Sequence, residues 1–109
     1  MPASNVNQDR FSFPPIATLR SIGAIHQELL DFIKINDATV VEFSADGQID
    51  ISVLQLLEAA RLYAGTAGKT IELAEPAAGP LLDTLRRSGF LEGMSAEDAH
   101  FWLHQGNIQ

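Results

Sequence analysis

The sequence predicts an α/β fold in which helices cover a mostly parallel β-sheet. Short β-branched segments alternate along the chain with segments whose apolar residues recur every three or four positions. The connections between successive predicted strands are long enough to hold a helix, which is what parallel strands require. Alternation of this kind is typical of a sheet and a helix layer packed around one core.

Length and composition limit the classes of function that this chain can serve. A chain of 109 residues is long enough to bury a core as one domain without metal or disulfide support. Fourteen acidic and seven basic residues give a formal net charge of −7, which repels nucleic-acid phosphates and anionic lipids. We therefore expect no nucleic-acid partner, and a basic surface on any protein partner.

The chain contains no cysteine, which excludes disulfides, thiolate nucleophiles and cysteine-based zinc sites. No run approaches the roughly 18 apolar residues that a membrane-spanning helix needs. The polar N-terminal residues also lack the basic and apolar blocks of a secretion signal. We expect a cytoplasmic protein without membrane insertion.

The first residues are predicted to be a leader and the rest one domain. Residues 1–10 are polar and predict a flexible leader, and residues 11–109 predict the single domain. Residues 11–13 alternate between apolar and polar side chains and predict a short strand. Pro14 and Pro15 end this strand because proline has no amide hydrogen to donate.

The remaining elements follow from hydrophobic periodicity and from turn residues. Leu19 belongs to the apolar face of the first predicted helix. Ser95 with Asp98 resembles a capping box at the start of the last one. In chain order we expect a helix over 17–35, a strand over 38–43, a helix over 52–67, a strand over 69–74, a helix from Pro80 to Ser88 and a helix over 95–105.

The junction between the strand over 38–43 and the helix over 52–67 is the first candidate site. In α/β folds, ligands bind beyond the carboxyl ends of strands. Asp46, Asp50 and Ser52 could be an acid, a base and a nucleophile, but no His or Lys stands beside Ser52 in sequence to activate it. Ser and Asp are also preferred at helix starts. We expect no catalytic residue here, and either a helix cap or a docking surface.

The last predicted helix carries a second candidate group. Glu97, His100 and His104 recur on one face with the spacing of metal ligands, but a zinc site needs further converging ligands and none is evident. A solvated polar face explains these side chains better, and we expect neither metal nor cofactor. Phe101 and Trp102 of this helix could cap the core or dock a partner, and core packing is the favoured interpretation.

The order of these segments resembles a STAS domain. This is the fold of anti-sigma factor antagonists, of the MlaB subunit of lipid transporters and of sulfate-transporter tails. Residues 39–44, Thr-Val-Val-Glu-Phe-Ser, resemble its central strand, and residues 49–57 resemble its Asp-Ser/Thr switch segment with the following helix. Residues 68–76 and 81–90 resemble the next strand, its proline loop and the third helix. The resemblance covers residues 11–91 and implies a mostly parallel or mixed sheet of about four strands, to which the helix over 95–105 is an addition.

The resemblance also implies a switch position, and this sequence departs from the family there. The family's phosphoacceptor directly follows the Asp, which carries over to Ile51, a residue that cannot be phosphorylated. Ser52 stands next and is the alternative acceptor, while Val53 replaces the usual Gly. Ordinary switch phosphorylation is therefore not expected, and an apolar Ile51 would favour constitutive packing against a partner.

The implied function is that of a non-enzymatic bacterial signalling protein. Its partner would be an anti-sigma or histidine-kinase-like ATPase, and the alternative is an MlaB-like accessory subunit that binds the ABC ATPase of a lipid transporter. A homodimer remains open. The predicted partner-binding residues are Asp46, Asp50, Ile51, Ser52 and Gln55.

Overall fold

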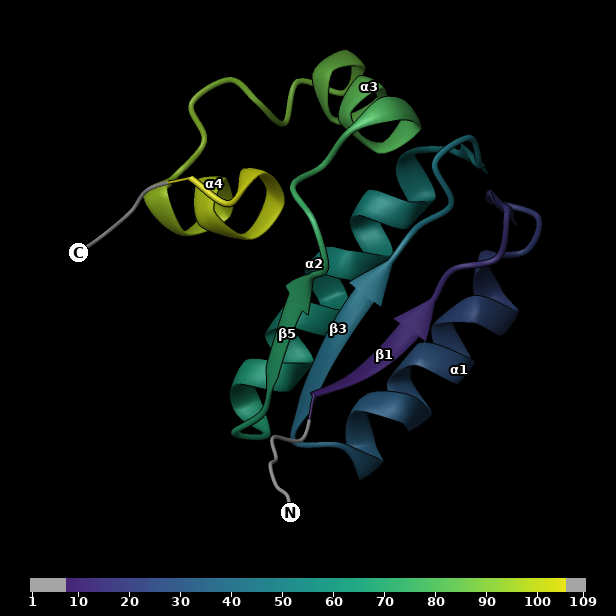
Figure 1. The fold of residues 1–109 in the computed structure, drawn as a ribbon, viewed down its shortest axis with the longest axis vertical. Coiled ribbons are helices and arrows are strands. Elements are labelled where there is room, and N and C mark those ends of the chain that lie inside the picture. Colours follow the sequence, from purple (N-terminus) through teal and green to yellow (C-terminus); the bar gives the residue numbers. More distant parts are fainter. Residues whose placement is uncertain (1–7, 106–109) are drawn as a thin grey trace.

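The computed structural model describes residues 8–105 and confirms an α/β fold (Figure 1). The main sheet has the strand order β1-β3-β5, and both pairings in it are parallel. A second, two-stranded parallel sheet joins β2 to β4. The strands are β1 (Gln8–Ser12), β2 (Ile16–Ala17), β3 (Ala38–Glu42), β4 (Gln48–Ile49) and β5 (Thr70–Leu73). The helices in this part of the chain are α1 (Ile22–Ile35), α2 (Ile51–Thr66), α3 (Gly79–Arg87) and α4 (Ala96–Leu103).

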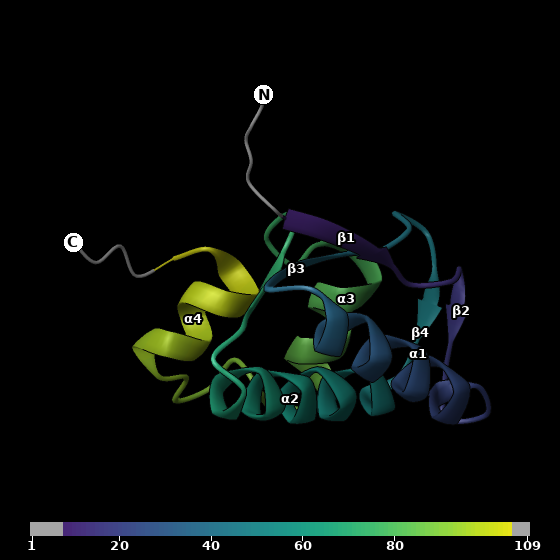
Figure 2. The same cartoon turned by 90° about the horizontal axis from the view of Figure 1, so that it is seen from below.

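Helices α1 and α2 cover one face of the main sheet (Figure 2). Each connects two neighbouring parallel strands, α1 from β1 to β3 and α2 from β3 to β5. Helix α3 lies beyond the carboxyl ends of the strands, and α4 lies beside β5 (Figure 1). The junction between β3 and α2 therefore lies at the carboxyl edge of the sheet, as the sequence predicts.

The core lies between the sheet and the helix layer, with α2 at its centre. The side chains of Phe101 and Trp102 are buried within it, so the prediction that they pack in the core is confirmed. The largest fully buried side chains are Trp102, Leu29, Ile33, Leu54, Leu57, Leu85, Val41, Val53 and Thr39.

The start of α4 has the cap that the sequence predicts, and the end of α3 has a glycine cap. At the end of α3, Phe90 N donates to Leu85 O at 3.1 Å and Gly89 N to Arg86 O at 3.3 Å. Gly89 has φ +85°, where a residue without Cβ is favoured, and the two bonds form a Schellman motif. At the start of α4, Ser95 Oγ accepts from Asp98 N at 3.0 Å.

The N-terminal part of the fold differs from the prediction in three ways. Strand β1 begins at Gln8, so residues 8–10 belong to the sheet and not to a leader; residues 1–7 lie outside the described part. Helix α1 begins at Ile22, because Ser21 N bonds to Thr18 O at 2.8 Å in a turn that precedes it. Leu19 therefore lies in a connection and is 73% exposed, where a buried helix face was predicted.

The sheet also differs from the one of about four strands that the resemblance implies, because the main sheet has three in the described part of the chain. Five strands are present in residues 8–105, divided between two sheets, and every pairing is parallel, so no mixed sheet forms there. Strands β2 and β4 are two residues long each, which is too short to leave a periodic pattern in the sequence.

Candidate functional site

The junction between β3 and α2 is braced by the segment that precedes α1. Gln48 N donates to Pro15 O at 2.7 Å, and Ile16 pairs with Gln48 in the ladder between β2 and β4. At Gly47, a Cβ atom would lie 2.9 Å from Pro15 O, so only glycine permits this approach without a shift. The second sheet thus holds the start of α2 against residues 15–19.

Asp50 fastens the same two segments together through its carboxylate. It is the N-cap of α2, and its Oδ1 accepts from Ser52 N at 3.0 Å and from Ser52 Oγ at 2.5 Å. Its Oδ2 accepts from Leu19 N at 2.9 Å. One carboxylate therefore caps a helix and anchors the connection between β2 and α1, so the cap that the sequence predicts has a second, long-range bond.

These hydrogen bonds change the acidity of Asp50. The Ser52 hydroxyl is the largest influence and holds the pKa of Asp50 below its ordinary value of 3.8. Partial desolvation opposes this, while the amides of Leu19 and Ser52 lower the pKa further. Asp50 is thus a satisfied, ionised acceptor, and such a group is a poor general base.

Ser52 is placed on the inside of the junction. The residue is 5% exposed, and its hydroxyl donates to Asp50. Transfer of a phosphoryl group to this oxygen, or its attack on a substrate, would require the first turn of α2 to open. The candidate phosphoacceptor is therefore a buried part of the cap.

Ile51 is the residue that the junction presents outward. It is the first residue of α2 and is 47% exposed, although it is large and apolar. Leu19 is 73% exposed, and its amide bonds to Asp50, the residue that precedes Ile51. Asp46 in the turn and Gln55 in the second turn of α2 are also exposed. We call Leu19, Asp46, Ile51 and Gln55 the junction surface.

Leu19 is the member of this surface that sequence reasoning missed. Its apolar side chain fitted the helical period of the residues that follow. The signal that could have corrected this is Ser21, which occupies the N-cap position of α1 and separates Leu19 from the helix.

Helix α2 carries uncharged side chains beyond the junction as well. Ile51, Gln55, Ala59 and Leu62 recur at spacings of four and three on its exposed side. Leu62 is also a large, exposed apolar residue. An amphipathic helix normally turns a charged face to water, so the outer side of α2 has the composition of a contact surface.

A groove of about 500 Å³ lies at the carboxyl edge of the sheet. The ends of β3 and β5 and the start of α3 form its walls, and Arg10 and Glu42, which pair with each other, lie at its side. Glu75 is a further acidic lining residue. Since no buried and unpaired polar group points into this groove among residues 8–105, it does not define a ligand.

The candidate metal ligands of α4 are not brought together. Within the described part of the chain, no cluster of three or more His, Asp or Glu side chains could hold a metal ion. His104 ends α4 in the left-handed conformation, and its Nε2 lies 3.1 Å from Leu73 O of β5. His104 thus fastens the end of α4 to the sheet.

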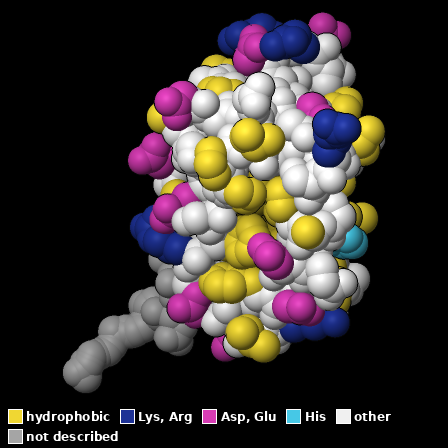
Figure 3. Space-filling model, turned by 90° about the vertical axis from the view of Figure 1, so that its right-hand side faces the viewer, with side chains coloured by type: hydrophobic (Ala, Val, Ile, Leu, Met, Phe, Trp, Pro, Cys, Tyr) yellow, Lys and Arg dark blue, Asp and Glu magenta, His cyan; other side chains and the backbone are white. Residues whose placement is uncertain are grey.

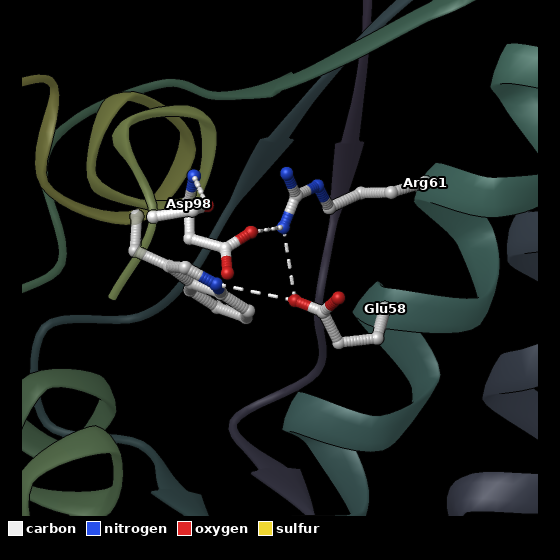
Figure 4. Close-up of polar contacts among 5 residues, drawn as sticks. Glu58, Arg61 and Asp98 are labelled. Atoms are coloured by element: carbon white, nitrogen blue, oxygen red, sulfur yellow. Dashed lines mark hydrogen bonds and ion pairs between the residues drawn. The ribbon is translucent and has the colours of Figure 1, made fainter. Parts of the chain in front are cut away.

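The polar side of α4 is joined to α2 through Arg61 (Figure 4). Arg61 Nη1 lies 2.9 Å from Glu58 Oε2 and 3.1 Å from Asp98 Oδ1. The indole of Trp102 donates to Glu58 Oε2 at 3.3 Å. The Arg61 guanidinium also lies 4.4 Å from the ring centre of Phe101. These contacts make Asp98 part of a helix–helix contact, whereas Glu97 and His100 are exposed.

No protein-family model, no curated protein and no solved structure matches this chain. Among residues 8–105, no helix combines the length and the apolar character that crossing a bilayer requires.

Proposed function

We propose that this chain is a non-enzymatic, STAS-type regulator that docks a protein partner on the junction surface. The observation that carries the proposal is the exposure of Ile51. This large apolar residue begins α2 at the carboxyl edge of the sheet and is 47% exposed. The partner class inferred from the resemblance is a kinase-like ATPase of a cytoplasmic signalling assembly.

The hydrogen bonds that order the junction support its role as a docking surface. The Asp50 carboxylate and the ladder between β2 and β4 hold the backbone on both sides of Ile51. A surface that is already ordered loses less conformational entropy when a partner binds. Ile51 and Leu19 would supply the apolar centre of the contact, with Asp46 and Gln55 at its polar rim.

The same geometry favours a contact that phosphorylation does not control. Ile51 has no hydroxyl, and the hydroxyl of Ser52 is buried against Asp50. A phosphate at this place would add about two negative charges to an apolar contact. We infer that partner binding does not depend on phosphorylation at Ile51 or Ser52.

The decisive experiment replaces Ile51 by a photo-crosslinking phenylalanine analogue in the producing cell and identifies the captured protein by mass spectrometry. A kinase-like ATPase is the expected product, and an ABC ATPase would favour the lipid-transport alternative. The control places the same analogue at Glu72, an exposed residue of β5 on the opposite side of the sheet.

The variant Ile51→Asp tests the affinity of the captured partner. We expect binding to weaken at least about tenfold, which corresponds to roughly 1.4 kcal/mol. The fold should persist, because an acid in the first turn suits the helix dipole. Equal capture at Ile51 and Glu72, or an unchanged affinity of Ile51→Asp, would remove the junction surface from the interface.

A further inference from the structure

The outer edge of β1 has backbone groups that point away from the sheet. Phe13 N, directly after β1, donates to Glu42 O at 2.9 Å. Backbone groups in a strand alternate between its two edges. The N–H and C=O groups of Phe11 therefore also point to β3, while those of Arg10 and Ser12 point outward. Strand β1 is the last strand on its side of the sheet in the described residues. Its N–H and C=O groups can therefore pair with another strand.

The opposite edge of the sheet differs from β1, because α4 covers it at the carboxyl end of β5. Thr70 N and Ala74 N of the β5 segment bond to β3, so the N–H and C=O groups of Leu73 point away from β3. Leu73 O accepts from His104 Nε2 at 3.1 Å, and α4 lies next to the carboxyl end of β5 (Figure 1). Covering an edge with a helix is a common protection against strand addition. In residues 8–105 no element covers the β1 edge in this way.

An apolar flank of α1 lies beside the β1 edge. Glu28, Phe32 and Ile35 recur at spacings of four and three on one side of α1. The ring centres of Phe32 and Phe11 are 5.5 Å apart, so this side of α1 borders β1. Ile35 is 79% exposed. Figure 3 views the side on which β1 and α1 lie and shows hydrophobic side chains gathered in a stripe that acidic side chains border.

The acidic side chains beside this stripe favour a basic binding partner. Asp9 lies on the same face of β1 as Phe11, and Glu28 lies on the α1 flank; both are exposed. Neither carboxylate belongs to an ion pair within residues 8–105. A second copy of this chain would bring another net charge of −7 to the same place, and like charges oppose that pairing.

We propose that the outer edge of β1, with the α1 flank formed by Glu28, Phe32 and Ile35, binds an extended basic segment of a partner protein as an added strand. The backbone of the segment pairs with Arg10 and Ser12, as in other cases of β-strand addition. Its apolar side chains pack on Phe32 and Ile35, and its cations lie near Asp9 and Glu28. This site is separate from the junction surface and does not rest on the function proposed above.

The test uses the full chain and a synthetic, end-blocked heptapeptide, Lys-Val-Lys-Val-Lys-Val-Lys. Titration calorimetry at low salt should detect binding, and amide resonances of Arg10 and Ser12 should shift in the NMR spectrum of the protein. A peptide with N-methylated valines loses backbone donors and should bind at least tenfold more weakly. A peptide with Glu in place of Lys should not bind.

Two pairs of variants locate the site on the protein. Arg10→Pro removes the outward N–H, whereas Arg10→Ala keeps it; both lose the ion pair with Glu42. The proline variant should bind at least tenfold more weakly than the alanine variant. Glu28→Lys should weaken binding, while Glu72→Lys, on another strand, should leave it nearly unchanged.

Several results would overturn the proposal. Equal binding of the N-methylated and parent peptides would exclude strand pairing, even if Arg10→Pro fails to fold. Shifts that miss Arg10 and Ser12 would place the peptide elsewhere, and absence of binding would refute the site. A dimer in sedimentation that Arg10→Pro abolishes would assign the edge to a second copy of the chain.

Discussion

At the scale of single residues, Asp50 has the largest structural role in the junction. Its two carboxylate oxygens accept from Ser52 N, Ser52 Oγ and Leu19 N. The neighbouring Ile51 has no polar partner and faces outward. Asp50 thus holds the start of α2 in place, and the adjacent Ile51 is available for contact with a partner.

Asp50→Ala should destabilise the protein by roughly 1–3 kcal/mol, because loss of an N-cap and unpaired donors both cost free energy. Urea denaturation followed by circular dichroism measures the change. The matched control is Asp46→Ala in the exposed turn, which should change the free energy of unfolding by less than about 0.5 kcal/mol. Similar losses in both variants would show that the Asp50 bonds are not stabilising.

The pH dependence of this difference follows from the lowered pKa of Asp50. An unfolded chain with the ordinary value of 3.8 binds the proton more readily than the folded chain. The stabilisation is therefore fully present above about pH 4 to 5 and is lost as the pH falls through the folded value. The gap between the parent and Asp50→Ala should narrow below that range; a gap that widens there would contradict the assignment.

At the scale of elements, α4 is an integral part of the fold. Its aromatic residues enter the core, and its polar residues meet α2 around Arg61. The Arg61 side chain is well covered and combines two ion pairs with the Phe101 ring contact. An arginine in this arrangement contributes through packing as well as through charge.

Arg61→Ala should lower the free energy of unfolding by roughly 1–3 kcal/mol, since it leaves two carboxylates without their partner beside an apolar ring. Arg61→Lys should recover only part of the loss, because an ammonium cannot stack as a planar guanidinium does. Arg87→Ala breaks the exposed pair with Asp83 and should have a much smaller effect. Equal effects of the two alanine variants would show that the α4 contact is no stronger than a surface pair.

At the scale of the whole molecule, one core joins the sheet, α2 and α4. Trp102 is the only tryptophan of the chain and lies in α4, so its fluorescence reports the docking of this helix. We expect the urea transitions seen by fluorescence and by circular dichroism to coincide, as they do for two-state domains. A fluorescence transition at a lower urea concentration would mean that α4 detaches before the rest unfolds.

Much of this architecture is predictable from the sequence because the patterns are local. The alternation of helical and β-branched segments predicted α1, β3, α2 and β5, and Ser95 predicted the N-cap of α4. The position of the junction and the exposure of Gln55 follow from the same patterns. The first helix start was misplaced, because Leu19 fits a helical period while its backbone bonds to Asp50.

The chain by itself determined the helices α1 to α4 and the strands β1, β3 and β5, apart from some of their bounds, and that α2 starts near Asp50, since these depend on neighbours within a few residues. Only the tertiary structure decided that Asp50 also holds Leu19, that Ser52 is buried, and that α4 covers the carboxyl end of β5 while β1 presents an open edge. These outcomes depend on contacts between residues about 30 positions apart in sequence, such as Leu19 with Asp50 and Leu73 with His104. Hydrophobic periodicity describes one segment at a time and carries no information about such pairs.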